Sequence, residues 1–271
     1  MPRYGRLLTD AQWEEIRPLL PKPIRHCHGG RPRAPDRKVL EGILWILRSG
    51  ARWQDLPDEF PHPSTCWRRL RDWEEQGVWL NIWRAFLAEL NERQQLNWSE
   101  SFLDGSFAPA KKGALRSARP AGGKARSGWW WSTARVFLWE TPFTLPPRPE
   151  VTLAETTLAT IRVARRHHPG RPRQKPERVI ADGGYDSDPL RERLARRGIQ
   201  LIAPHHSNRK KPATQDGRAL RRYQRRWIVE RTIGWLGNFR RLVVRYDRSL
   251  IIYRAFFHIA CFMLVLRRVL Q

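Results

Sequence analysis

Cysteine is scarce in this chain of 271 residues, which holds only Cys27, Cys66 and Cys261. No two of them stand in a CxxC spacing, so the sequence supports neither a zinc ribbon nor a disulfide framework. The fold must therefore be held by an apolar core, and a chain of this length can bury one. Hydrophobic residues make up 41% of the sequence, which excludes a disordered tail.

Acidic residues are also few, because 26 Asp and Glu stand against 51 Lys and Arg, a net charge of +25. Arginine dominates the excess, and its guanidinium group suits bidentate contacts with phosphate. Such a charge favours binding to a polyanion through counterion release. A ribosomal or membrane-surface protein is the alternative. The 14 tryptophans argue against a ribosomal extension, because they indicate a folded domain.

Long uninterrupted apolar runs are missing as well. The first residues, MPRYGRLLTD, have no apolar core of a signal peptide, so we expect a cytoplasmic protein. Residues 249–270 are the most apolar segment, but Arg254 and His258 interrupt it short of the ~20 residues of a membrane span. We interpret this segment as a buried C-terminal helix that packs on the catalytic core, with no membrane partner.

Residues 1–95 have the pattern of a separate helical, DNA-binding domain. A helix beginning at Asp36 is stopped by Ser49-Gly50, and after a proline-rich turn Ser64 can cap a further helix over 65–76. Two helices joined in this way resemble a helix-turn-helix. The second helix carries basic side chains that either face DNA or form an ordinary solvated surface. Because the whole chain is basic, we interpret them as facing DNA: Arg68, Arg69 and Arg71.

Residues 96–271 alternate short apolar runs with helical patterns, which predicts an α/β fold. The expected strands lie at 102–104, 179–181 and 199–203, and a long basic helix is expected over 217–237. In such a fold ligands gather at the carboxyl ends of the strands. Between residues 162 and 226 we count 19 basic and 6 acidic residues, which would hold phosphate groups near that edge.

Three acidic residues occupy chemically informative places in this second region. Asp104 in SFLDGSF and Asp182 in RVIADGGYD each follow an expected strand, and Glu230 lies in the basic helix. Two strand-end aspartates and a helix glutamate suit a site with two metal ions, Mg²⁺ or Mn²⁺, for phosphoryl transfer. Asp104 would bridge the ions and Glu230 would hold one. The alternative is that each acid is an isolated surface residue.

Asp182 has two competitors nearby, Asp186 and Asp188. Asp182 ends the apolar run directly, and the following Gly183-Gly184 permits a tight turn. We therefore favour Asp182 as the metal ligand and expect Asp186 to brace the turn or the next helix.

Several segments, taken together, resemble bacterial insertion-sequence transposases of the insertion-sequence-five group. The similar segments cover most of the chain and include DRKVLEGILWILRSGARWQDLP, FLDGSFAPAKKG, VIADGGYDSDPLRERLARRGIQLIAP and RRYQRRWIVERTIGWLGNFRRLVVRYDR. The resemblance implies a DDE triad of Asp104, Asp182 and Glu230 on a ribonuclease-H-like mixed-sheet domain over 96–271. It also implies dependence on Mg²⁺, recognition of terminal inverted repeats by the N-terminal domain, and homo-oligomers on double-stranded DNA of transposon ends and target.

Related transposases place a Tyr, an Arg, the Glu and a Lys along the last catalytic helix. Tyr223, Arg226 and Glu230 fit that spacing, and the Lys position falls on Gly237. By this resemblance Tyr223 and Arg226 contact DNA, and Arg240 or Arg241 can take the place of the missing lysine.

Residues 114–149 depart most from the resemblance, because the fold needs its second and third strands there. The segment is rich in Pro and Trp and has no clean alternation, so we expect these strands to be disrupted. Trp has one codon, TGG, and reading Trp129 to Trp131 one nucleotide earlier yields a run of valines. One hypothesis is therefore that this segment is frameshifted, and a copy damaged in this way would be inactive. The other hypothesis is a genuine insertion.

Overall fold

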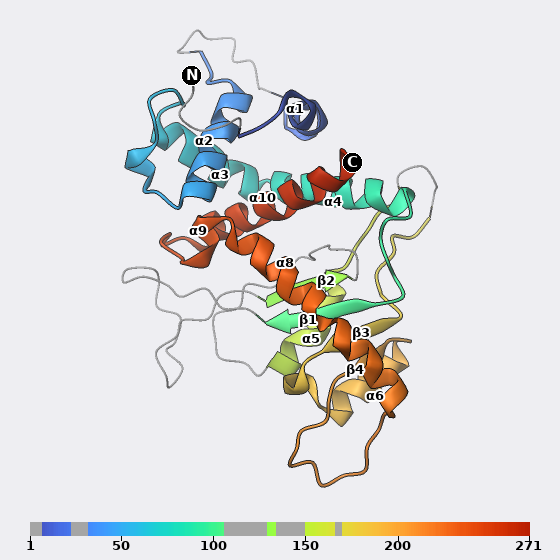
Figure 1. Cartoon of the computed structure of the whole chain (residues 1–271). Coiled ribbons are helices and arrows are strands. Elements are labelled where there is room, and N and C mark those ends of the chain that lie inside the picture. Colours follow the sequence, from blue (N-terminus) through green and yellow to red (C-terminus); the bar gives the residue numbers. More distant parts are fainter. Residues whose placement is uncertain (1–6, 23–31, 106–128, 134–149, 166–169) are drawn as a thin grey trace. The chain divides into compact units, whose positions relative to one another are not determined.

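The computed structural model describes residues 7–22, 32–105, 129–133, 150–165 and 170–271 (Figure 1). The described residues form two compact units. The first unit holds the residues up to Phe86 and those from Gly237 to Gln271, and the second holds those between Leu87 and Leu236. Which unit binds DNA and which one carries out catalysis remain predictions.

The first unit is helical, and local sequence signals account for the ends of its helices. Its elements are α1 (Asp10–Ile16), η1 (Arg17–Leu19), α2 (Asp36–Ser49), η2 (Trp53–Asp55), α3 (Pro63–Glu75), most of α4 (Val78–Glu92), α9 (Arg240–Val243) and α10 (Leu250–Val269). Thr9 caps α1 through a capping box with Gln12. Gly50 ends α2 in the left-handed conformation, with φ of 72°.

Helix α3 begins earlier than its sequence pattern predicted. Pro63 is its first residue, and the ring of His62 accepts the hydrogen bond from the backbone of Ser64. Ser64 is therefore inside the helix and not its cap. The preference of proline for the first helical position explains the difference, since a missing N–H costs nothing there.

The C-terminal helix α10 is the centre of the first unit. It contacts α3 and α9, and its Phe262 and Phe257 pack against Trp79 and Trp83 of α4 with ring centroids 6.0 and 6.1 Å apart. By length and composition α10 could cross a membrane, but 72% of its apolar window is buried inside the molecule, as in a core helix. The expectation of burial is confirmed, because the helix packs against other helices of the first unit.

The second unit is built on a four-stranded mixed sheet. Its strands are β1 (Ser101–Gly105), β2 (Trp129–Thr133), β3 (Arg178–Ala181) and β4 (Gln200–Ile202), in the order β2-β1-β3-β4. Strand β1 is antiparallel to β2 and parallel to β3, and β3 is parallel to β4. Its helices are α5 (Glu150–Ala159), η3 (Gly183–Tyr185), α6 (Asp188–Arg196), α7 (Gly217–Leu220), η4 (Arg221–Arg226) and most of α8 (Trp227–Gly237).

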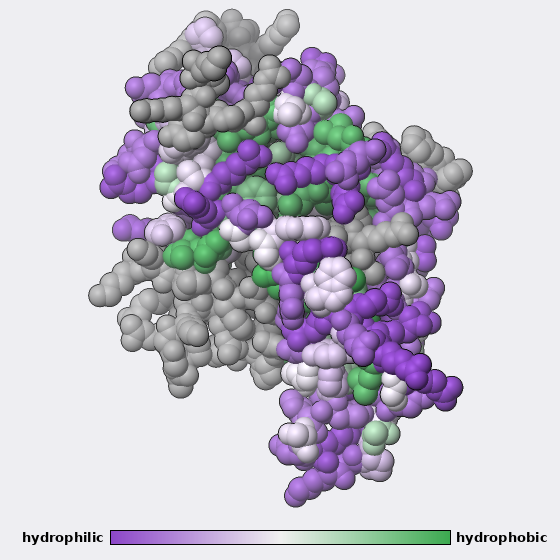
Figure 2. All heavy atoms as spheres, in the orientation of Figure 1, coloured by the Kyte–Doolittle hydropathy of each residue, from purple (hydrophilic) through white to green (hydrophobic). Residues whose placement is uncertain are grey.

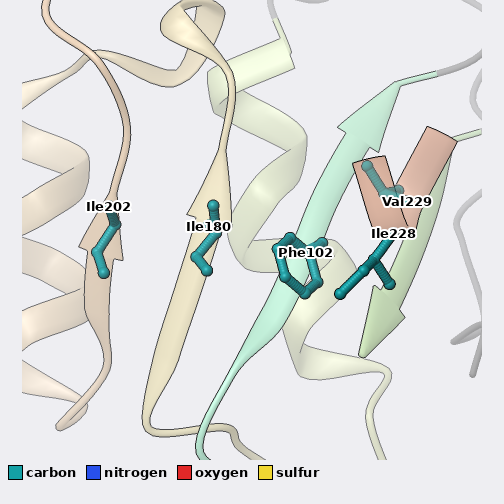
Figure 3. Close-up of a cluster of buried hydrophobic side chains, with 5 residues drawn as sticks. All are labelled: Phe102, Ile180, Ile202, Ile228 and Val229. Atoms are coloured by element: carbon teal, nitrogen blue, oxygen red, sulfur yellow. The ribbon is translucent and has the colours of Figure 1, made fainter. Parts of the chain in front are cut away.

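One face of this sheet is buried under α8. Phe102, Ile180 and Ile202 lie side by side on three neighbouring strands, and Ile228 and Val229 of α8 pack against them (Figure 3). All five side chains are at most 5% exposed. The cluster therefore attaches the segment that carries Glu230 to the strands that carry Asp104 and Asp182.

Two expectations for this unit need correction. A single helix was expected over 217–237, whereas the structure divides it into α7, the 3-10 helix η4 and α8. The second strand was expected to be disrupted, yet Trp129–Thr133 pairs with β1 as strand β2, with Asp104 opposite Trp130. The rest of the unusual segment, residues 114–128 and 134–149, lies outside the described residues.

Candidate active site

Two of the three predicted acids meet at the carboxyl ends of parallel strands. Strands β1 and β3 pair Phe102 with Ile180 and Leu103 with Ala181. Asp104 and Asp182 directly follow the last of these pairs, so both lie at the same edge of the sheet, where neighbouring strands are about 4.8 Å apart. Their side chains are 13% and 30% exposed.

Arg226 at the end of η4 is shared by the two aspartates. Its Nη2 lies 3.1 Å from Oδ2 of Asp104 and 3.9 Å from Oδ2 of Asp182, while Nη1 donates to the Tyr223 hydroxyl at 3.2 Å. Desolvation by burial lowers the pKa of Arg226, but the Tyr223 hydrogen bond and the Asp104 charge raise it by more, so it ends above its ordinary value. A permanent positive charge thus lies against both carboxylates.

Asp182 is held by the turn that follows β3. Its carboxylate accepts a hydrogen bond of 3.0 Å from the Gly184 backbone and so caps η3. Among the described glycines with positive φ are Gly50, Gly77 and Gly198, and neither Gly183 nor Gly184 is one of them. The two glycines begin the 3-10 turn η3, so the tight turn expected after Asp182 is present and needs no left-handed residue.

The competing aspartates are engaged elsewhere. Asp186 is 3% exposed and accepts hydrogen bonds from Arg191 at 2.5 Å and from the His206 backbone at 2.9 Å, while His205 lies at 2.9 Å. Burial raises the pKa of Asp186, but these hydrogen bonds lower it by more, so it lies well below its ordinary range.

Asp188 pairs with Arg209 through both carboxylate oxygens, at 3.0 and 2.9 Å. Asp186 thus braces the turn against the chain after β4, as predicted, and Asp182 is the aspartate left at the strand edge.

Glu230 is not brought to the aspartate pair. It lies on α8, one turn after Arg226, with an exposed side chain. Within the described ranges, no three His, Cys, Asp or Glu side chains are grouped closely enough to hold a metal ion. The structure thus brings Asp104 and Asp182 of the predicted triad together and leaves Glu230 exposed on α8.

The arginines predicted to contact DNA differ in availability. Arg68 is exposed, whereas Arg69 of the same helix pairs with Asp36. Arg71 lies over the Trp67 ring at 5.3 Å and pairs with Asp72 at 2.7 Å. All three lie on α3 of the first unit.

The two arginines after α8 also differ. Arg240 is exposed. Arg241 is 5% exposed and donates to both oxygens of Asp247, at 2.9 and 3.1 Å, and to the Ala51 carbonyl at 2.9 Å. Arg241 therefore has a structural role inside the first unit. On the face shown in Figure 2, hydrophilic residues cover much of the described surface.

Sequence reasoning missed one group beside this site. Glu100, the residue before β1, is 1% exposed and pairs with both Arg222 and Arg225 of η4. A glutamate directly before an apolar strand, together with two arginines at i and i+3, was the signal available in the sequence.

The aspartate pair has the chemistry of a divalent cation site. Mg²⁺ and Mn²⁺ prefer hard carboxylate oxygens, and the position between Asp104 and Asp182 already accepts a cation, the Arg226 guanidinium. These two residues therefore fit a divalent cation.

Comparison with known proteins matches most of the chain to transposases. Residues 8–83 match the family described as "Putative transposase of IS4/5 family", and residues 148–266 match the family "Transposase DDE domain". The second match includes Asp182 and Glu230, while Asp104 lies between the two matched ranges.

Curated relatives agree with these families. The "Insertion element IS402 uncharacterized 16.2 kDa protein" of Burkholderia cepacia is 43% identical over 104 residues, which is 37% of this chain and 71% of the relative. The "Uncharacterized protein y4sN" of Sinorhizobium fredii is 34% identical over 45% of this chain and 91% of the relative. The "Putative transposase for insertion sequence element IS402" of Burkholderia cepacia is 42% identical over 34% of this chain and 40% of its own length.

Residues 148–266, which include most of the second unit, thus belong to the class of transposase DDE domains. The chain as a whole belongs to the IS4/5 family of insertion-sequence transposases.

Proposed function

We propose that this transposase binds the terminal inverted repeats of an insertion sequence and catalyses metal-dependent DNA cleavage and strand transfer. The observation that carries the proposal is the register of β1 and β3, which sets Asp104 beside Asp182. Both acids contact Arg226, four residues before Glu230.

The proposed catalytic domain is ribonuclease-H-like. The sheet order β2-β1-β3-β4, with one antiparallel and two parallel pairings, supports this fold. In the proposed mechanism Asp104 and Asp182 hold Mg²⁺ or Mn²⁺, and two such ions would stabilise the entering and leaving oxygens of the phosphodiester. Arg226 releases the aspartates and turns to phosphate, and Glu230 of α8 supplies the third carboxylate.

DNA contacts are proposed for both units. Arg68 and Arg71 of α3 and the exposed Arg240 would contact DNA from the first unit, and Tyr223 and Arg226 from the second. Arg69 and Arg241 are left out of this set because each is paired and largely buried, at 14% and 6% exposure, whereas Arg71 is 39% exposed beside its partner Asp72. Homo-oligomers on paired transposon ends in the bacterial cytoplasm complete the proposal.

The test is cleavage of end-labelled duplex DNA that carries the inverted repeats of the element encoding the protein. With Mg²⁺, cleavage followed by joining is expected for the natural chain, and Asp104→Asn should lower the cleavage rate about a thousandfold or more. Glu192→Gln, which removes an exposed acid of the same unit, serves as the control. Undiminished cleavage by Asp104→Asn would refute the assignment of Asp104.

A second function is favoured by one observation, the position of Glu230 outside the aspartate group. A copy that binds inverted repeats without cutting them would act as an inhibitor of transposition. Retarded but uncut DNA in the same assay supports that function, and cutting at arbitrary sites without joining would indicate a metal-dependent nuclease.

A further inference from the structure

Glu100 is a buried acid for which the proposed mechanism has no use. Its side chain is 1% exposed, and it lies immediately before β1, the strand that ends in Asp104. Arg222 donates to one of its carboxylate oxygens and Arg225 to the other. A charge at this depth is costly unless it is paired, so the two arginines account for its presence.

The backbone of η4 explains how two arginines reach one carboxylate. In a 3-10 helix there are three residues per turn, so side chains at i and i+3 lie directly above one another. Arg222 and Arg225 have this spacing, and η4 spans Arg221–Arg226. An α-helix through the same residues would rotate the two side chains apart by about 60° in total. The expected continuous helix is interrupted where this pairing occurs.

The charges of this group do not cancel. One carboxylate faces two guanidinium groups, which leaves one positive charge. The Arg222 and Arg225 side chains remain 40% and 47% exposed, although their partner is buried. Each guanidinium has five N–H donors in a rigid fork, and one donor on each is used for Glu100. Both side chains thus keep exposed surface on the solvent side, while a buried carboxylate orients their guanidinium groups.

We propose that Glu100 orients Arg222 and Arg225 as a clamp for a phosphate group of the DNA backbone. Guanidinium forks recognise phosphate through paired, charge-assisted hydrogen bonds. Asp104 lies four residue steps after Glu100, about 13 Å away at the rise of a β-strand. The clamp therefore holds DNA on the flank of the aspartate pair. The inference rests on the proposed function, because it names a contact with the same substrate.

The first test measures DNA binding as a function of salt by fluorescence anisotropy of a labelled duplex. Arg222→Gln and Arg225→Gln should each weaken binding about tenfold. Each should also lower the slope of log K against log salt by about 1. Arg221→Gln is the matched control, because it removes an exposed arginine of the same 3-10 helix that is not bound to Glu100. Equal effects of all three variants would overturn the clamp.

Glu100→Gln gives a second test, because a positioning role and a simple effect of net charge predict opposite changes in DNA affinity. Removing a negative charge from a DNA-binding protein raises its affinity if only net charge matters. If Glu100 positions the arginines, the variant binds more weakly and its salt slope falls, even though the protein is more basic. Tighter binding by Glu100→Gln would therefore refute the positioning role. The two arginine variants keep the clamp testable should Glu100→Gln fail to fold, as circular dichroism would show.

Failure of the clamp and failure of the proposed function are distinguishable. If the natural chain binds no duplex DNA, both are refuted. If it binds DNA and the Arg222 and Arg225 variants match Arg221→Gln, the clamp alone is refuted, and the buried pairing serves only to attach η4 to the sheet.

Discussion

Two arginine–aspartate contacts, one in each unit, show how differently the same chemistry is used. In the first unit Arg241 and Asp247 are 6% and 7% exposed and form two hydrogen bonds of 2.9 and 3.1 Å. In the second, Arg226 is shared by Asp104 and Asp182 at 3.1 and 3.9 Å, and all three side chains are more exposed. The first contact is closed, which means that it is buried and pairs one cation with one acid. The second contact is open, because it is partly exposed and has one cation for two acids.

The difference indicates which contact can be exchanged. Separating Arg241 from Asp247 leaves a buried charge with no solvent to receive it. The Arg226 contact is partly exposed, and its two carboxylates are the kind of ligand that a divalent ion prefers, so we expect that another cation can replace the guanidinium there. A closed pair therefore stabilises the fold, and a shared, partly exposed one is suited to function.

The largest expected effect is that of breaking the closed pair. Arg241→Met should cost about 3–5 kcal/mol of unfolding free energy, because Asp247 is left buried without its partner. Urea denaturation measures the loss. Arg240→Met is the control, and this exposed neighbour should change stability by less than about 0.5 kcal/mol. Similar losses in the two variants would remove the contrast between the contacts.

How much of this arrangement the sequence predicts depends on the range of the interaction. Helix α2 was predicted because Asp36 begins it and Gly50 ends it, both of which are local signals. Strands β1 and β3 were predicted from their apolar runs, and the positions of Asp104 and Asp182 followed from the rule for strand ends.

Long-range partners were not predictable in the same way. Periodicity shows that α10 is buried but not against what, and in the structure it packs against α3 and α9. Arg226 meets Asp104 across 122 residues, and Arg225 meets Glu100 across 125. The 3-10 form of η4 follows from such pairings, so helical spacing alone predicted a continuous helix.

A smaller effect on stability, which depends on pH, is expected for Asp186, an acid of the second unit whose side chain is 3% exposed. Its folded pKa is depressed, so it contributes stability above its ordinary value of 3.8, and this contribution is lost as the pH falls through the folded value. We expect Asp186→Asn to destabilise the protein at pH 7 and to flatten the fall in stability below about pH 4.

Urea midpoints at pH 7, 5 and 3 measure this dependence. Asp58→Asn, at an exposed position of the first unit, is the comparison. An unchanged slope in Asp186→Asn would show that the bracing contacts of Asp186 do not contribute to acid sensitivity.

The open contact should respond to metal ions. If Mn²⁺ competes with the Arg226 guanidinium for Asp104 and Asp182, Arg226→Gln binds the ion more tightly. If the variant binds Mn²⁺ tenfold more tightly, saturating Mn²⁺ stabilises it by about 1.4 kcal/mol more than it stabilises the natural chain. This corresponds to an additional rise of about 3 °C in melting temperature. Calorimetric melts with Mn²⁺ and with EDTA measure the difference. A metal-induced shift equal to that of the natural chain would mean that Arg226 does not occupy the cation position.

The smallest effects contrast one glycine in each unit. Gly50 has φ of +72°, and a Cβ there would lie 3.0 Å from Cβ of Arg240. Gly50→Ala should therefore lower the free energy of unfolding by about 1–2 kcal/mol. Gly234 lies in α8, and a Cβ added there would meet no atom of the described residues within 4 Å, so Gly234→Ala should gain about 0.5–1 kcal/mol from helix propensity. Denaturation of both variants measures the signs. A loss in Gly234→Ala would show that this face of α8 needs a bare backbone, as close approach of a ligand would require.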